Sequence, residues 1–121
     1  MPQLQTDQAI DDLVMSVVNT GQAAALAGAT DFAWDQVALF YEGTPLEYTE
    51  GLVGKTGLKD RFYASSPSLL VFLAGGETVH LAMVGPDRLR GPFGVLLGAG
   101  TVVTPNPLWP QVALLDDPAA Q

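Results

Sequence analysis

The chain has 121 residues, no cysteine and a net charge of −8, from 13 acidic and 5 basic residues. Its apolar content of 48% is too high for a disordered chain. The lack of cysteine excludes disulfides, thiolate catalysis and cysteine metal sites. The negative charge argues against nucleic acid and anionic membranes as partners of the bulk surface. It favours a basic protein partner or cations, and the alternative is that it only provides solubility.

The length of the chain allows one domain, which we expect to span residues 1–121 with a frayed tail over 116–121. No window of 18 apolar residues occurs, so we expect no transmembrane segment. No signal peptide is visible at residues 1–3. The compartment therefore stays open: cytoplasmic, or extracytoplasmic if a leader was removed.

Residues 6–28 predict an amphipathic helix. Its apolar side chains recur at the spacing of one helix face, at Ile10, Leu13, Val14, Val17 and Val18. We expect Thr6 to cap the helix, Gly21 to interrupt it and Gly28 to end it. The apolar stripe is narrow, so the helix needs a sheet to cover.

Residues 32–41 predict a strand, because the segment is aromatic and β-branched. Phe32, Trp34, Ala38 and Phe40 would share one face, with Gln36 among them. We therefore expect either a bulge near residues 35–36 or burial on both faces.

A short helix is expected next, from Pro45 to about Val53. Thr44 would be its cap, Pro45 its first residue and Glu47 the partner that reaches back to the cap amide. Gly54 would end it.

Residues 68–84 predict a β-hairpin, with Gly75 and Gly76 as a two-residue loop. This loop predicts the cross-strand pairs Phe72–Val79, Leu70–Leu81 and Ser68–Met83 on one side, and Val71–His80 and Leu73–Thr78 on the other. Both faces are apolar, so either a helix and a loop cover them or one face is an interface. Candidates for that interface are Leu69, Val71 and Leu73. Trp109 is either an exposed anchor of the interface or part of a loop that covers the core.

Residues 95–97 and 101–103 predict another strand pair or one bent strand, and residues 111–115 predict a last edge strand. The order of elements gives an α+β class. The strands after Pro67 are too close together for βαβ crossovers. We expect a mostly antiparallel sheet with the hairpin at its centre, the N-terminal helix packed on one face and one short extra helix.

Three motifs follow one another along the chain. The first, in a strand, is carried by Phe32, Trp34, Asp35, Val37, Leu39 and Phe40; the second, in a helix, by Thr44, Pro45, Glu47, Glu50 and Gly54; and the third, in a later strand, by Leu70, Val71, Phe72 and Gly76. In this order they resemble a family of small bacterial cell-envelope proteins, often lipoproteins, of uncharacterised function. The chain lacks the lipobox cysteine of such lipoproteins. The resemblance covers roughly residues 31–80, and it implies a fold more than an activity.

Candidate catalytic groups are few. His80 is the single histidine, and a half-buried or surface position on a strand explains it better than a metal or catalytic role, which would need distant carboxylates. Asp35 is better explained as an acceptor from a backbone amide or a cap of a neighbouring turn than as a general acid. The glycines at 91, 94, 98 and 100 form no dinucleotide or phosphate loop, so we expect no cofactor.

The five basic residues flank the hairpin and would converge if its ends come together. They form a candidate anion site made of Lys55, Lys59, Arg61, Arg88 and Arg90, with local pairing to acidic neighbours as the alternative. The leading hypothesis is a small acidic, non-enzymatic interaction module that binds a protein partner or dimerises through its sheet. The alternative is a binder of small anions, or an enzyme, that uses the basic cluster and His80.

Overall fold

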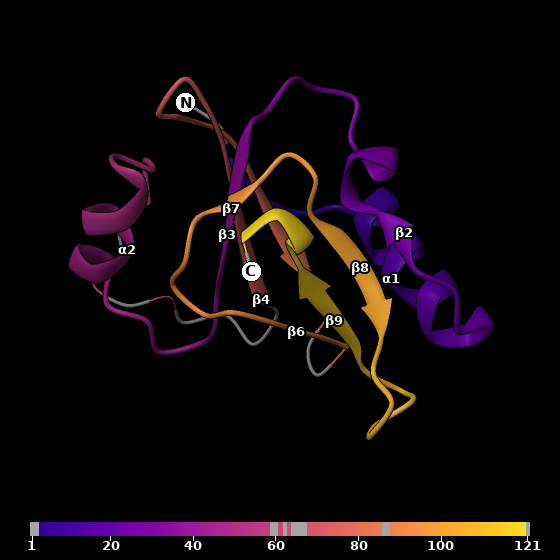
Figure 1. Cartoon of the computed structure of the whole chain (residues 1–121). Coiled ribbons are helices and arrows are strands. Elements are labelled where there is room, and N and C mark those ends of the chain that lie inside the picture. Colours follow the sequence, from indigo (N-terminus) through magenta and orange to yellow (C-terminus); the bar gives the residue numbers. More distant parts are fainter. Residues whose placement is uncertain (1–2, 59–60, 62, 64–67, 86–87, 121) are drawn as a thin grey trace.

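The computed structural model describes residues 3–58, 61, 63, 68–85 and 88–120 (Figure 1). Within them the fold is α+β, which confirms the predicted class. The helices are α1 (Gln8–Thr20), α2 (Leu46–Val53) and the short 3-10 helices η1 (Leu26–Ala29) and η2 (Pro118–Ala120). The strands are β1 (Leu4–Thr6), β2 (Ala24–Ala25), β3 (Gln36–Phe40), β4 (Ser68–Ala74), β5 (Glu77–Val84), β6 (Leu89–Arg90), β7 (Leu97–Gly98), β8 (Val102–Pro105) and β9 (Ala113–Asp116).

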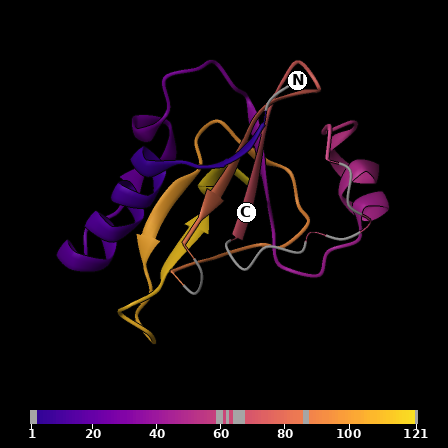
Figure 2. The same ribbon diagram turned by 180° about the vertical axis from the view of Figure 1, so that it is seen from behind.

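The described strands form two sheets rather than one. The larger sheet has the order β1-β5-β4-β3-β7, and the smaller sheet has the order β2-β8-β9-β6. The pairs β1–β5 and β6–β9 are parallel, and the other pairs are antiparallel. Figures 1 and 2 show α2 on one side of the larger sheet, and the smaller sheet with α1 on the other.

The hairpin of β4 and β5 lies in the interior of the larger sheet, and both of its faces are covered. One core cluster lies between that sheet, the smaller sheet and α1, and includes Ile10, Val14, Leu70, Phe72, Val103 and Leu115. A second cluster lies on the opposite face and includes Phe40, Val53, Leu69, Val71 and Leu81. This two-sided burial explains why β4 is apolar at almost every position rather than alternating.

The predicted hairpin loop is confirmed, but most of the predicted register is wrong. Gly75 and Gly76 have φ of 60° and 83°, and Leu73 pairs with Thr78 as expected. A bulge between Phe72 and Leu73 then shifts the pairing, so that Phe72 lies opposite His80. One extra residue on β5 moves every later side chain to the other face, and no glycine or proline marks the bulge in the sequence.

Helix α1 is shorter than predicted at both ends. Its cap is Asp7, whose carboxylate accepts a hydrogen bond from the Ile10 amide at 3.2 Å, whereas Thr6 belongs to β1. Gly21 ends the helix in the left-handed conformation at φ 71°, so residues 24–29 form β2 and η1 instead of a continuation. The apolar face, with Ile10, Val14 and Val17 buried, is as expected.

Helix α2 agrees with the predicted bounds to within one residue and ends before Gly54. The predicted capping by Thr44 is wrong, because its hydroxyl donates to the Tyr41 carbonyl at 2.7 Å. Upstream, β3 begins only at Gln36, and its four following residues are buried. Burial on both faces is therefore the alternative that holds for this strand.

The C-terminal third differs most from expectation. Strands β7 and β8 belong to different sheets, and β9 lies between β8 and β6 instead of at an edge. Within the expected frayed tail, Asp116 is part of β9, and Asp117 is buried, with its carboxylate accepting a hydrogen bond from the Gly98 amide at 2.7 Å. This buried hydrogen bond ties the end of the chain to β7.

Candidate functional site

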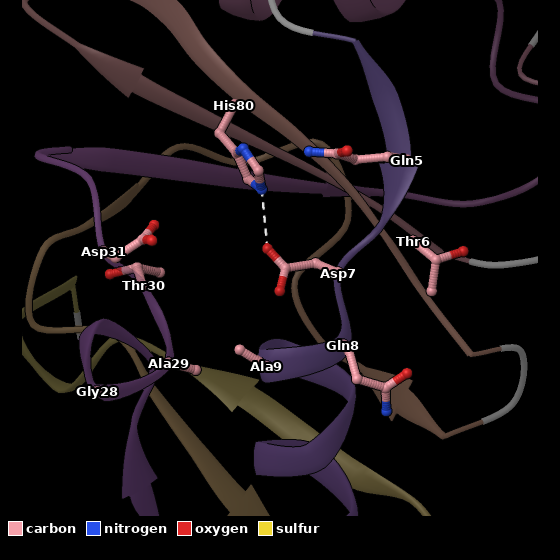
Figure 3. A pocket seen from close by; sticks show the side chains of 10 residues that line it. All are labelled: Gln5, Thr6, Asp7, Gln8, Ala9, Gly28, Ala29, Thr30, Asp31 and His80. Atoms are coloured by element: carbon pink, nitrogen blue, oxygen red, sulfur yellow. Dashed lines mark hydrogen bonds and ion pairs between the residues drawn. The ribbon is translucent and has the colours of Figure 1, made fainter.

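A pocket of about 480 Å³ opens beside the N-terminus of α1 (Figure 3). Strand β1, the start of α1, η1 with the residues after it, and β5 bring its walls together. The lining residues are Gln5, Thr6, Asp7, Gln8, Ala9, Gly28, Ala29, Thr30, Asp31 and His80. Polar groups from four separate segments thus meet around one hollow.

Asp7 connects the elements around this pocket. One carboxylate oxygen accepts the cap hydrogen bond from Ile10, and the other lies 2.8 Å from Nε2 of His80 on β5. The backbone amide of Asp7 donates to the Met83 carbonyl, also on β5, at 3.4 Å. Both oxygens of the carboxylate are therefore already engaged within the protein.

His80 is half-buried on its strand, which is one of the two predicted positions. Its side chain is 17% exposed, and the side chain of Asp7 is 15% exposed. Its ring lies 4.3 Å from the Phe32 ring and 5.8 Å from the Phe72 ring, between centroids. The bulge produces this arrangement by placing His80 on the Phe72 side instead of the predicted Val71 side. In the described part of the chain, no three His, Asp or Glu side chains are grouped to hold a metal ion.

Asp35 accepts a hydrogen bond from a backbone amide, as predicted. Its carboxylate accepts from the Gly75 amide at 3.0 Å, and its own amide donates to the Leu73 carbonyl at 2.8 Å. These bonds join the start of β3 to the hairpin loop, 40 residues away in sequence. The role seen for Asp35 is structural.

The predicted basic cluster is distributed over separate elements. Lys55 follows α2, whereas Arg88 and Arg90 lie at β6, and Lys59 lies outside the described residues. The Arg90 guanidinium lies 5.2 Å from the ring centroid of Tyr41. Arg61 lines a pocket of about 400 Å³, and the other charged residues among its described lining are Glu47 and Glu50. This acidic setting does not favour an anion at Arg61, and the anion site stays a prediction.

Three of the four residues predicted for the sheet-face interface are buried within the chain. Leu69 and Val71 are fully buried and Leu73 is 3% exposed, because α2 and the residues near it cover this face. Trp109 differs: it is 60% exposed in the loop between β8 and β9, next to Leu108 at 77%.

Sequence reasoning missed an aromatic surface made of Tyr41, Tyr48 and Phe93. The Phe93 ring is nearly parallel to both tyrosine rings, at centroid distances of 5.5 Å to Tyr41 and 5.9 Å to Tyr48. Phe93 is 43% exposed and Tyr48 49%. A hollow of about 500 Å³ adjoins the rings and is lined by Tyr41, Glu42, Gly43, Thr44, Pro45 and Phe93.

In the sequence, one local signal points to this surface, and it is the glycine at position 94, next to Phe93. Gly94 has φ of 65°, and a Cβ there would lie 2.5 Å from the Tyr48 hydroxyl oxygen. Glycine is thus required both for the backbone conformation and for the approach of Tyr48. The rings come from the residue after β3, from α2 and from the segment between β6 and β7, so no spacing rule predicts their meeting.

Comparison with family models, with curated proteins and with solved structures found no match for this chain. Among the described residues, the helices are too short or too polar to cross a membrane. The assignment of a function therefore rests on the surfaces described above.

Proposed function

We propose that this protein is a non-enzymatic interaction module that binds a basic, partly apolar segment of a protein partner at the aromatic surface. The observation that carries the proposal is the exposure of Tyr48 and Phe93 beside a hollow. The segment that carries Phe93 packs against α2, and this packing explains the contact between the Phe93 and Tyr48 rings. It does not explain why nearly half of each residue is exposed to solvent. Exposed aromatic side chains are typical of binding hot spots.

The overall charge of −8 favours a basic partner. Near the aromatic surface the charges are mixed: the exposed Glu42 lines the hollow beside the rings, whereas the Arg90 guanidinium lies 5.2 Å from the centroid of the Tyr41 ring. The adjoining hollow is lined by Glu47, Glu50 and Arg61. Two hollows, of about 500 and 400 Å³, share Pro45 as a lining residue and so adjoin each other. Neighbouring hollows between carboxylates suit an extended segment that inserts an apolar side chain into one and presents Lys or Arg to the rim.

Self-association through a sheet has less support than a separate partner. Both faces of the larger sheet are covered within the chain. The edge strands of the two described sheets have only two or three residues each, which is a common way to block edge pairing. Two copies would also repel each other, because each carries −8.

A selection from a displayed library of random peptides tests the proposal. We expect enrichment of peptides that contain Lys or Arg next to an apolar residue, with binding that weakens as salt is raised. Phe93→Ala and Tyr48→Ala should each lower the affinity for the selected peptide roughly tenfold or more, the range of a hot-spot residue.

The matched control is Val79→Ala, which removes an apolar side chain that is 37% exposed on β5. It should leave peptide binding unchanged. Failure to enrich any sequence, or equal binding by the Phe93 and Val79 variants, would show that the aromatic surface is not the binding site. Light scattering on the purified protein should report a monomer, and a stable dimer would favour self-association instead.

A further inference from the structure

The loop between β8 and β9 is a second exposed apolar feature, on a different part of the molecule from the aromatic surface. It projects from the smaller sheet at the bottom of Figure 1, and Figure 2 shows the same projection from behind. Leu108, at 77%, and Trp109, at 60%, are the most exposed large apolar side chains among the described residues. We propose that this loop inserts into the interfacial layer of a zwitterionic lipid bilayer.

The charge distribution supports this assignment. No charged residue occurs between Arg90 and Asp116, although the chain as a whole carries −8. The loop therefore pays no penalty for burying a charge, whereas the acidic remainder of the protein stays in water. Tryptophan beside an aliphatic residue is the typical composition of segments at the membrane–water interface.

The backbone of the loop is also suited to a medium that offers few hydrogen-bond partners. Pro105, Pro107 and Pro110 have no amide hydrogen. The Asn106 side-chain oxygen accepts from the amides of Leu108 at 2.9 Å and Trp109 at 3.3 Å. The Val112 amide donates to the Trp109 carbonyl at 3.0 Å.

These internal bonds make insertion into a bilayer less costly, because the hydrocarbon boundary supplies no hydrogen-bond groups for the amides of Leu108, Trp109 and Val112. A projecting tip inserts readily into lipid but needs a matching pocket on a protein. The bulk negative charge makes zwitterionic lipid the favoured surface over anionic lipid.

Two apolar side chains support only weak, reversible binding, comparable to a single short anchor. The loop therefore acts as an insertion contact rather than as a permanent anchor. This inference does not depend on the proposed binding of a basic peptide, which uses Tyr41, Tyr48 and Phe93.

Tryptophan fluorescence tests the inference, because the chain has only two tryptophans. In a Trp34→Phe background, Trp109 becomes the single emitter. With phosphatidylcholine vesicles we expect its emission to shift to shorter wavelength and to be quenched by brominated acyl chains. Vesicles that contain phosphatidylglycerol should bind more weakly, and added salt should reduce the difference.

Two matched variants in the same background, each adding one negative charge, make the test specific. Leu108→Asp should lower the partition coefficient roughly 10- to 100-fold, the loss expected when one buried leucine is removed from an apolar medium. Val79→Asp adds the same charge on β5 and should leave partitioning nearly unchanged, with circular dichroism as the check on folding.

Three results would overturn the inference. The first is unshifted Trp109 emission at millimolar phosphatidylcholine, and the second is an equal effect of the two aspartate variants. The third is a shift of Trp109 emission on binding the selected basic peptide, with none on binding lipid, which would identify the loop as part of a protein interface.

Discussion

The pocket beside α1 and the aromatic surface beside α2 are built from different residues, and they differ in how far their groups are already engaged. In the pocket, the Asp7 carboxylate has a partner on each oxygen, and His80 packs against Phe32 and Phe72. At the aromatic surface, the rings contact one another, yet Tyr48 and Phe93 stay 49% and 43% exposed.

This difference separates a site that stabilises the fold from one that is available to a partner. Titratable side chains in a pocket are a usual marker of function, but here their hydrogen bonds hold β1, α1 and β5 together. Substitutions in the pocket should therefore reduce stability, whereas substitutions at the aromatic surface should reduce binding with little loss of stability.

The largest effect is expected for Phe72→Ala, behind the pocket. Phe72 is fully buried, and its ring meets the rings of Phe32, Trp34 and His80. Removing it leaves a cavity, and we expect a loss of about 3–5 kcal/mol in the free energy of unfolding, measured by urea denaturation. A loss below about 1 kcal/mol would mean that the packing behind the pocket is not part of the core.

Asp7→Ala should cost about 1–3 kcal/mol, because it removes the cap of α1 and the partner of His80 together. Asp7→Asn is the matched control, since asparagine also caps helices and should cost less. A double-mutant cycle with His80→Gln isolates the contact between the two side chains. If Asp7→Ala leaves the free energy of unfolding unchanged, the contacts of Asp7 in the pocket do not stabilise the fold, and a binding role for the pocket would be favoured instead.

Gly94→Ala should cost about 1–2 kcal/mol and should separate Tyr48 from Phe93. The new Cβ would meet the Tyr48 hydroxyl at 2.5 Å, and φ of 65° is strained for alanine. Near-ultraviolet circular dichroism should report the lost ring packing. Gly100→Ala is the control, because a Cβ there meets no atom within 4 Å. Similar losses in both variants would show that the approach of Tyr48 is not the cause.

Phe93→Ala should have the smallest effect on stability, about 1 kcal/mol, because its ring is 43% exposed and loses the stacking on two tyrosines and one edge contact with the buried Phe40 ring. The same variant should no longer bind the selected basic peptide with measurable affinity. Denaturation and peptide titration on one preparation therefore compare the two regions directly. A loss of stability as large as that of Phe72→Ala would remove the distinction between them.

Local chemistry was enough to predict several elements from the sequence. Gly75 and Gly76 predicted the hairpin loop, the apolar periodicity predicted the buried face of α1, and Gly54 predicted the end of α2. The backbone-acceptor role of Asp35 was also predicted. Each of these depends on the backbone preferences or side-chain chemistry of a few neighbouring residues.

Other features were decided only by the tertiary structure. The bulge after Phe72 reversed the facing of His80, and the division into two sheets separated β7 from β8. The aromatic surface joins residues 41, 48 and 93, and the pocket joins residues 7 and 80. Such contacts depend on how the covered faces of the sheets pack against each other. The free energy of that packing is shared among residues far apart in sequence, so no local pattern could reveal it.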